Sequence, residues 1–248
     1  MIPFVVLASL KMFEEKVSFT KFRSKEFVKN NLAVIIVAIL VGSTGVYYAF
    51  FAGIFWFVSS LITSLTRKNR EVFYTGLLSI GIIIGALIVN LSPSIYSKLM
   101  NEPNSEAAAR SAAESEVLGL KIDQILLPIQ GHRIKIFDEI SRHYAATAPL
   151  VNENSSVSLG MLGSLGFLML LFFLFYSPKH LDVKIKNMSL LNIAAVLIAT
   201  IGGFSYIIAA LITPSIRGYN RIIPFYRIYV NFRSSNIVSI LAKQIQEK

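Results

Sequence analysis

The chain is poor in charge and has no cysteine. Charged residues make up 15% of its 248 residues, whereas a soluble domain of this size carries about a quarter. Hydrophobic residues make up 54% and the mean hydropathy is +0.61, which excludes a disordered chain. These values place the chain among the proteins of the lipid bilayer.

Familiar enzyme signatures are missing as well. The sequence has no Gly-x-x-x-x-Gly-Lys loop, no His-Glu-x-x-His and no Gly-x-Ser-x-Gly. His132 and His143 lie eleven residues apart and His180 lies in another loop, so we expect no metal site, and no cofactor is evident. Asp138 and Glu139 would supply a general base or, alternatively, form the solvated face of a helix. The catalytic residues are therefore unknown from the sequence.

What the sequence does have is four long stretches without a charged residue, at 30–66, 72–97, 154–178 and 187–216. A helix needs about 20 apolar residues to cross the hydrocarbon layer of a bilayer. A chain of this length could not bury four such stretches in a soluble core. We therefore predict an all-α protein, a polytopic bundle of transmembrane helices.

The first stretch is too long for one span and short for two. Gly-Ser-Thr-Gly at 42–45 is a turn-like break, which predicts a helical hairpin of residues 27–41 and 46–65. A hairpin brings the basic residues on both sides of it to one face of the membrane. Three further spans are expected, at 73–95, 158–176 and 190–212. The bundle would then have about five spans, of which the first two are short.

The charges indicate which loops lie on which side. Half of the 24 Lys and Arg residues fall in three segments, around 11–29, 67–70 and 179–186, whereas eight of the 14 acidic residues fall in 96–156. The positive-inside rule predicts that the basic loops are cytoplasmic and that the loop at 96–156 is extracytoplasmic. This asymmetry explains the net charge of +10 without a nucleic-acid partner.

Five parts are expected along the chain. Residues 1–29 form a cytoplasmic-side amphipathic segment after a truncated span, 30–95 three spans, 96–156 the extracytoplasmic loop, 157–212 two spans, and 213–248 a basic, polar C-terminal segment. The apolar residues 1–10 are either the end of a helix that begins upstream or a short interfacial anchor. Phe19, Phe22, Phe27 and Val28 alternate with basic residues, which is typical of a helix on the membrane surface.

Two finer features concern helices. In the large loop we predict a helix at 105–118, a turn at 128–131 and a second helix at 135–144 that Pro149 ends. Two glycine repeats would let helices approach closely, or reflect only the frequency of glycine in membrane helices. These repeats are Gly81 with Gly85, and Gly160 with Gly163 and Gly166.

A cluster after the last span is the strongest candidate for a binding site. Arg217, Tyr219, Asn220 and Arg221 would lie at the outer end of the bundle, where two guanidinium groups bind phosphate well. His132 and Arg133 could join this anion site if the large loop folds back. The alternative is that Arg and Tyr anchor the chain at the level of the headgroups.

Four short segments together resemble one bacterial family. They are VYYAFF at 46–51, LPIQGHRI at 127–134, NENSS at 152–156 leading into LG at 159–160 and GSLG at 163–166, and SIRGYNRI at 215–222. In combination they are similar to the later half of polytopic inner-membrane sugar translocases, phosphoglycerol transferases and GT-C-like glycosyltransferases of surface polysaccharide synthesis. The resemblance covers about residues 30–222.

The resemblance implies a multi-pass protein of the bacterial inner membrane and a polyprenyl-phosphate-linked donor at its outer face. Arg217 and Arg221 match the family's basic positions best, followed by His132 and Arg133. The family's catalytic acid would lie in an outer loop upstream of Met1, so the missing N-terminal half is an expected partner and the chain alone is an incomplete enzyme. We therefore expect the C-terminal membrane portion of a transferase that acts on lipid-linked sugar or glycerol phosphate. A transporter or flippase component, or a truncated non-catalytic membrane protein, is the alternative.

Overall fold

A computed structural model describes residues 1–19, 25–101, 110–152, 154, 157–176, 178 and 181–231. The chain divides into two compact units, residues 1–109 and 110–248. In the described part of both units the regular elements are helices, apart from one isolated bridge between two extended residues. The predicted all-α class is therefore confirmed.

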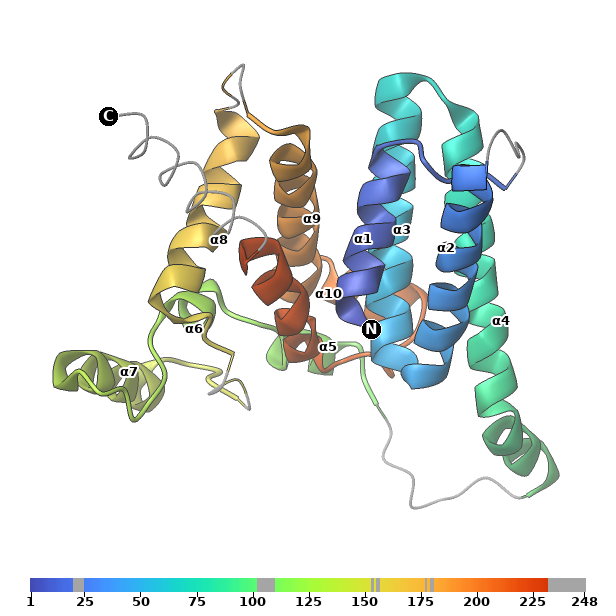
Figure 1. The fold of residues 1–248 in the computed structure, drawn as a ribbon. Coiled ribbons are helices and arrows are strands. Elements are labelled where there is room, and N and C mark those ends of the chain that lie inside the picture. Colours follow the sequence, from blue (N-terminus) through green and yellow to red (C-terminus); the bar gives the residue numbers. More distant parts are fainter. Residues whose placement is uncertain are drawn as a thin grey trace. The chain divides into compact units, whose positions relative to one another are not determined.

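The first unit is a bundle of α1 (Ile2–Phe13), α2 (Lys25–Thr44), α3 (Val46–Arg67) and α4 (Arg70–Met100) (Figure 1). α3 packs on α1 and α4, and α4 also packs on α2. α2 and α3 are separated by Gly45, whose φ of 135° lies in a region that L side chains rarely adopt. The predicted break is thus confirmed, and residues 32–65 belong to two helices.

The N-terminal segment is part of this bundle. Val5, Leu10 and Met12 of α1 are buried, and the Trp56 indole N–H donates to the Val5 carbonyl oxygen at 3.1 Å. The amphipathic segment expected around Phe19 and Phe22 extends over residues 20–24, which lie outside the described residues. α1 therefore packs as a helix against α3 along its buried face.

The first unit buries small polar side chains between its helices beside aromatic ones such as Phe55 and Trp56, and it exposes many large apolar side chains on α2 and α4. α4 buries Thr75, Gly76 and Ser79, and α3 buries Ser59, Ser60 and Thr63. Large apolar residues of α2 and α4 are instead about half exposed or more. These are Leu32, Ile36, Ile39 and Leu40 on α2, and Leu78, Ile84, Ile88 and Val89 on α4. α3 and α4 are long and apolar enough to span a membrane.

Close helix packing occurs at glycines outside the predicted repeat. A Cβ built on Gly42 would lie 2.6 Å from the Ile83 carbonyl oxygen, and one built on Gly76 would clash with Ser60. A Cβ on Gly81 or Gly85 would meet no heavy atom of the described residues within 4 Å. The Gly81 and Gly85 repeat therefore makes no close helix contact within this part of the chain.

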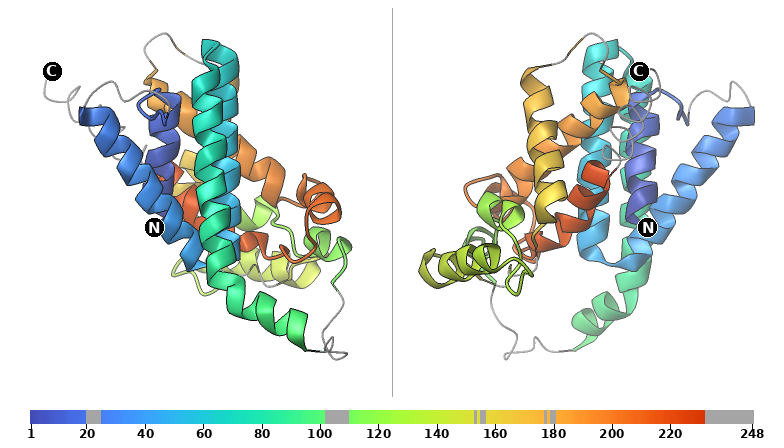
Figure 2. Two further views of the ribbon diagram at one scale, coloured as in Figure 1. Left: turned by 90° about the vertical axis from the view of Figure 1, so that its right-hand side faces the viewer. Right: turned by 60° about the vertical axis from the view of Figure 1, so that its left-hand side comes forward.

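The second unit contains six helices with named bounds. They are α5 (Ala113–Val117), α6 (Ile122–Leu126), α7 (Lys135–Thr147), α8 (Gly160–Phe175), α9 (Val183–Ala199) and α10 (Ser205–Leu211). The 3-10 turn η2 (Tyr219–Ile222) leads into a helical segment at 223–231. α8 packs on α9, and residues 223–231 lie beside α8 in Figure 1 and in the right view of Figure 2. Gly166 of the second glycine repeat packs against Val230.

The span predicted at 190–212 is wrong as a single helix. α9 ends at Ala199, and the chain turns through Gly202, whose φ is 78°, before α10 begins. α8 and α9 have 16 and 17 residues, which corresponds to about 24–26 Å of rise, less than the hydrocarbon thickness. Five spans therefore stay a prediction, since two helices meet the criteria for a span.

The helices of the large loop differ in part from expectation. α7 confirms the helix predicted at 135–144 and extends it to Thr147. In the helix predicted at 105–118, residues 105–109 lie outside the described residues, and the helical part is limited to α5, which has five residues. This segment has few apolar residues to bury, and the carboxylates of Glu114 and Glu116 bind other parts of the unit instead.

Candidate functional site

One segment of the large loop, from Glu114 to Lys121, forms hydrogen bonds with the break between α9 and α10. The Leu120 N–H donates to the Ala199 carbonyl at 2.8 Å, and the Ile201 N–H donates to the Leu120 carbonyl at 2.9 Å. The Glu116 carboxylate accepts from the Gly202 N–H. These contacts satisfy backbone groups that the interrupted helix leaves unpaired. Hydrogen bonds from the large loop therefore stabilise the non-helical backbone between α9 and α10.

Residues 114–124 and the break at 199–202 together form a hub. A second set of contacts binds residues 151, 152 and 154 to this hub. The Asn154 amide donates to the Gly119 carbonyl at 3.1 Å, and the Asn152 amide donates to the Val117 carbonyl at 2.9 Å. The Gln124 amide donates to the Val151 carbonyl at 2.7 Å. These side chains replace the regular backbone pairing that an irregular segment lacks.

Arg217, the first residue of the predicted anion site, lies at this hub. Its guanidinium forms an ion pair with the Glu114 carboxylate of α5. The pKa of Glu114 is lowered, first by the Arg217 hydrogen bond and then by the Ser111 backbone N–H, with a smaller electrostatic contribution from Arg110. Two arginines therefore act on the Glu114 carboxylate, while the second acid of α5, Glu116, accepts from the Gly202 N–H.

The other residues of the C-terminal cluster are differently exposed. Tyr219 is fully buried, and its hydroxyl lies 3.5 Å from the Ser205 carbonyl oxygen of α10. Asn220 is half-buried and Arg221 is exposed at the 3-10 turn. The buried Tyr219 ring anchors the turn, and the turn keeps Arg217 and Arg221 within one short segment at the end of α10.

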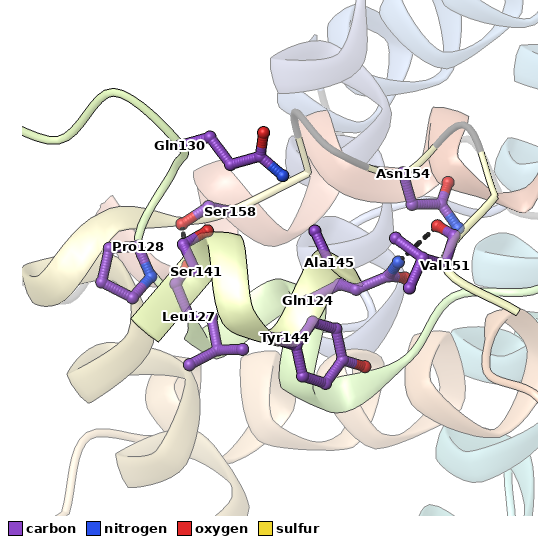
Figure 3. A pocket seen from close by; sticks show the side chains of 10 residues that line it. All are labelled: Gln124, Leu127, Pro128, Gln130, Ser141, Tyr144, Ala145, Val151, Asn154 and Ser158. Atoms are coloured by element: carbon purple, nitrogen blue, oxygen red, sulfur yellow. Dashed lines mark hydrogen bonds between the residues drawn. The ribbon is translucent and has the colours of Figure 1, made fainter. Parts of the chain in front are cut away.

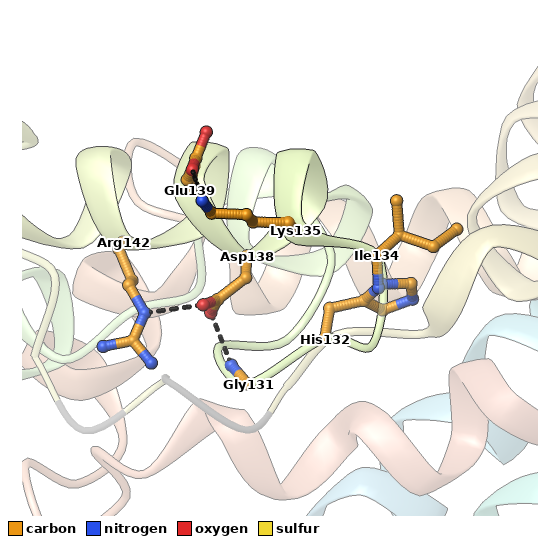
Figure 4. Close-up of polar contacts among 7 residues, drawn as sticks. All are labelled: Gly131, His132, Ile134, Lys135, Asp138, Glu139 and Arg142. Carbon is orange, nitrogen blue, oxygen red and sulfur yellow. Dashed lines mark hydrogen bonds and ion pairs between the residues drawn. The ribbon is translucent and has the colours of Figure 1, made fainter.

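His132 and Arg133 lie in the turn that precedes α7 (Figure 4). The His132 Nδ1 accepts from the Ile134 N–H at 3.1 Å, and its ring contacts Phe137 edge-on with centroids 5.3 Å apart. Arg133 is exposed. The contacts of His132 are thus local to its own turn, whereas Arg217 contacts α5. A shared anion site for these two groups stays a prediction.

Asp138 stabilises the turn that carries His132. Its carboxylate accepts from the Gly131 N–H at 2.6 Å and from the Arg142 Nε at 2.8 Å (Figure 4). These hydrogen bonds, that of Gly131 first, lower the pKa of Asp138. A carboxylate with a lowered pKa is a weak general base, so this geometry favours a structural role for Asp138.

Two hollows lie beside α6 and α7. The first, of about 30 Å³, is lined by residues that include Gln124, Ser141, Asn154 and Ser158 (Figure 3); this volume suits a water molecule but not a sugar. The second, of about 710 Å³, is wide and shallow. Its lining is mostly apolar with acidic groups: Leu126, Leu127, Ile140, Tyr144, Asp123, Glu139, His143 and Thr147.

Comparison of the chain with protein families, with curated proteins and with solved structures finds no match. In the residues that the structure describes, no group of three or more His, Asp or Glu side chains could hold a metal ion. Sequence reasoning missed Glu114, the partner of Arg217, because the two residues are 103 positions apart. It also missed the bonds of Asn152 and Asn154, for which the polar run at 152–156 was the available signal.

Proposed function

We propose that the chain is a multi-pass membrane protein. The observation that supports this proposal is the distribution of side chains in the first unit, where serine, threonine and glycine lie between helices beside buried aromatic residues, and many leucine, isoleucine and valine side chains of α2 and α4 lie outside. In water such an arrangement would expose a large apolar surface. In lipid it is favourable, because helices associate through small and polar side chains while apolar side chains contact the acyl chains.

The proposed location is a bacterial plasma membrane, with the basic loops in the cytoplasm and the loop at 96–156 outside. Because the chain has no cysteine, single cysteines report on topology without background. Ser111→Cys should react with an impermeant maleimide applied to intact cells, and Lys68→Cys should react only after permeabilisation. Labelling of Lys68→Cys alone in intact cells would reverse the proposed orientation.

We further propose that the chain is the membrane portion of a transferase that acts on lipid-linked sugar or glycerol phosphate for surface polysaccharide. The arginines at Glu114 support this proposal, because Arg110 and Arg217 act on one carboxylate and Arg221 is exposed nearby in the sequence. Guanidinium groups bind phosphate oxygens through paired hydrogen bonds. The Arg217 side chain is 41% exposed, so an incoming phosphate can reach it.

In this proposal Arg217 exchanges its partner when the donor binds. A phosphate ester carries more charge than one carboxylate and offers more acceptor oxygens, so it competes with Glu114 for the guanidinium. Tyr219 holds the turn in place from inside the unit, and Asn220 and Arg221 complete the proposed site. His132 and Arg133 belong to the proposed site through the family resemblance.

Lipid binding by the purified protein in nanodiscs tests this function. Native mass spectrometry should detect a complex with a short polyprenyl phosphate and a much weaker one with the corresponding polyprenol. Arg217→Gln combined with Arg221→Gln should remove the preference for the phosphate. Arg70→Gln, an exposed arginine of the first unit, is the matched control. Equal binding of phosphate and alcohol by the unmodified protein would contradict the proposal.

A further inference from the structure

α7 differs from the apolar helices of the second unit, because it is polar overall and yet strongly amphipathic. Ile136 and Ile140 follow each other at one helical turn, and their exposed fractions are 62% and 48%. Ile129 and Ile134, in the segment before α7, are also about half exposed. Isolated apolar residues are normal on a surface, but a stripe on one helix face indicates a binding surface.

The orientation of this stripe is fixed by the opposite side of α7. Ser141 is buried against the rest of the unit, and Asp138 binds the Gly131 N–H of the preceding turn. Figure 4 shows Asp138 pointing to this turn while Glu139 and Lys135 point away from it. α7 therefore cannot turn its isoleucines inward without breaking these contacts.

The apolar surface continues from α7 toward α8. Ile140 of α7 lines the same hollow as Leu126 and Leu127 at the end of α6. The Ser164 hydroxyl of α8 in turn donates to the Leu126 carbonyl at 3.0 Å. The first turns of α8 expose Met161, Leu162 and Leu165, and Leu162 is 83% exposed. The isoleucine stripe thus lies near the N-terminal end of α8, where large apolar side chains are exposed.

The direction of α7 matches a helix that lies along a surface. In Figure 1 and in the right view of Figure 2, α7 runs across the direction of α8 near the end of that helix. Arg133 and Lys135, both exposed, stand at the start of α7 beside the isoleucines. Helices of this kind, with one apolar face and a polar composition overall, lie in the interface of a bilayer with basic side chains at the headgroups.

We infer that α7 is an interfacial helix whose Ile136 and Ile140 insert into the lipid bilayer at the end of α8. The occupant of the stripe is the headgroup and upper acyl region of the membrane, and Arg133 and Lys135 contact the lipid phosphates. This inference rests on the proposed membrane insertion of α8. An interfacial α7 would hold the large loop at a fixed distance from the membrane surface, next to the lipid-linked donor of the proposed function.

Site-directed fluorescence in vesicles tests the inference on the full chain. Ile136→Cys and Ile140→Cys are each labelled with the fluorophore NBD, and the protein is reconstituted into phosphatidylcholine and phosphatidylglycerol vesicles. Nitroxide groups near the top of the acyl chains should quench both labels by about twofold or more, as expected for residues buried in the interface. Ala146→Cys, exposed on α7 and turned about 80° and 120° around the helix axis from Ile136 and Ile140, is the matched control and should be quenched less than either isoleucine label.

A label on Leu165→Cys of α8 separates the possible failures. If Leu165 is quenched and the α7 isoleucines are not, the interfacial role of α7 is wrong while membrane insertion stands. If Leu165 is not quenched, the proposed membrane insertion of α8 fails and the inference fails with it. If the isoleucine labels show a blue shift without quenching by lipid nitroxides, another protein surface covers α7, and the lipid assignment is overturned.

Discussion

The two units achieve their packing by different means. In the first unit, α2, α3 and α4 are joined by short turns such as Gly45, and they contact one another at small side chains within the helices. In the second unit the long-range contacts at the hub are hydrogen bonds and an ion pair between residues 27 to 103 positions apart. Local sequence patterns therefore mark the helix boundaries of α2, α3 and α4 in the first unit, whereas contacts between distant loop residues fix the break in the second.

The largest expected effect concerns the close helix contacts of the first unit. Gly42→Val places side-chain atoms against the Ile83 carbonyl, where a Cβ alone would lie 2.6 Å away, and the backbone cannot move aside cheaply. We expect a loss of about 3 kcal/mol in the free energy of unfolding, the upper range for overpacking. Detergent-induced unfolding followed by circular dichroism measures this loss.

Gly85→Val is the control for that substitution. It introduces the same side chain into a helix of the same unit, at a position where a Cβ meets no described heavy atom within 4 Å. The cost of a β-branched residue in a helix is shared by both variants and cancels in the comparison. An equal loss for both variants would show that close packing at Gly42 does not hold the first unit together.

Two buried asparagines allow a second comparison, one in each unit. In the first unit the Asn31 side chain accepts from the Ser18 N–H at 3.0 Å and donates to the Ser18 carbonyl. In the second unit Asn192 of α9 is fully buried, and neither of its amide atoms has a hydrogen-bond partner among the described residues. The same substitution should therefore have opposite effects at these two positions.

Asn31→Leu leaves both backbone groups of Ser18 unsatisfied, so we expect a loss of about 2 kcal/mol. Asn192→Leu replaces an unsatisfied buried amide by an apolar group of similar size, so we expect a gain of about 1 kcal/mol. Unfolding in the same detergent measures both variants. Destabilisation by Asn192→Leu would instead show that this amide has a partner in the membrane-embedded protein.

Much of the first unit could be predicted from its sequence. The break at Gly45 and the start of α3 at Val46 agree with the structure, although α2 continues to Thr44 through the other three residues expected to form the break. The span expected at 73–95 lies within α4. The signals were strong because a charge or a turn residue marks each boundary. Lys68 has a left-handed φ of 52°, and Asn69 caps α4 by accepting from the Glu71 N–H.

The second unit could be predicted less well, for an identifiable reason. Hydropathy treats residues 187–216 as one apolar run, and the interruption after Ala199 depends on Leu120, which lies far away in the large loop. The ion pair of Arg217 with Glu114 likewise joins two segments with no common pattern. The spacing of the glycines alone also could not show which of them contact another helix. Contact depends on which face of α4 meets a neighbour, and that face carries Gly76 rather than Gly81.

The smallest expected effect is the pH dependence of the Glu114 ion pair. Because the pKa of Glu114 is lowered in the folded chain, its contribution to stability is present above the ordinary glutamate value of 4.5 and is lost as the pH falls through the lowered pKa. The unfolding midpoint of the unmodified protein should therefore fall more steeply below about pH 4.5 than that of Glu114→Gln. The effect is small because both side chains are partly exposed.

Glu139→Gln is the control, since the Glu139 carboxylate lies 3.9 Å from Lys135 on an exposed helix face; it should keep the pH dependence of the unmodified protein. The same Glu114→Gln variant also tests the proposed partner exchange. If Glu114 competes with a lipid phosphate for Arg217, its neutralisation should tighten binding of polyprenyl phosphate while leaving binding of polyprenol unchanged. Weaker phosphate binding would mean that the carboxylate positions Arg217 for the ligand, and the hub at α5 would then belong to the binding site rather than compete with it.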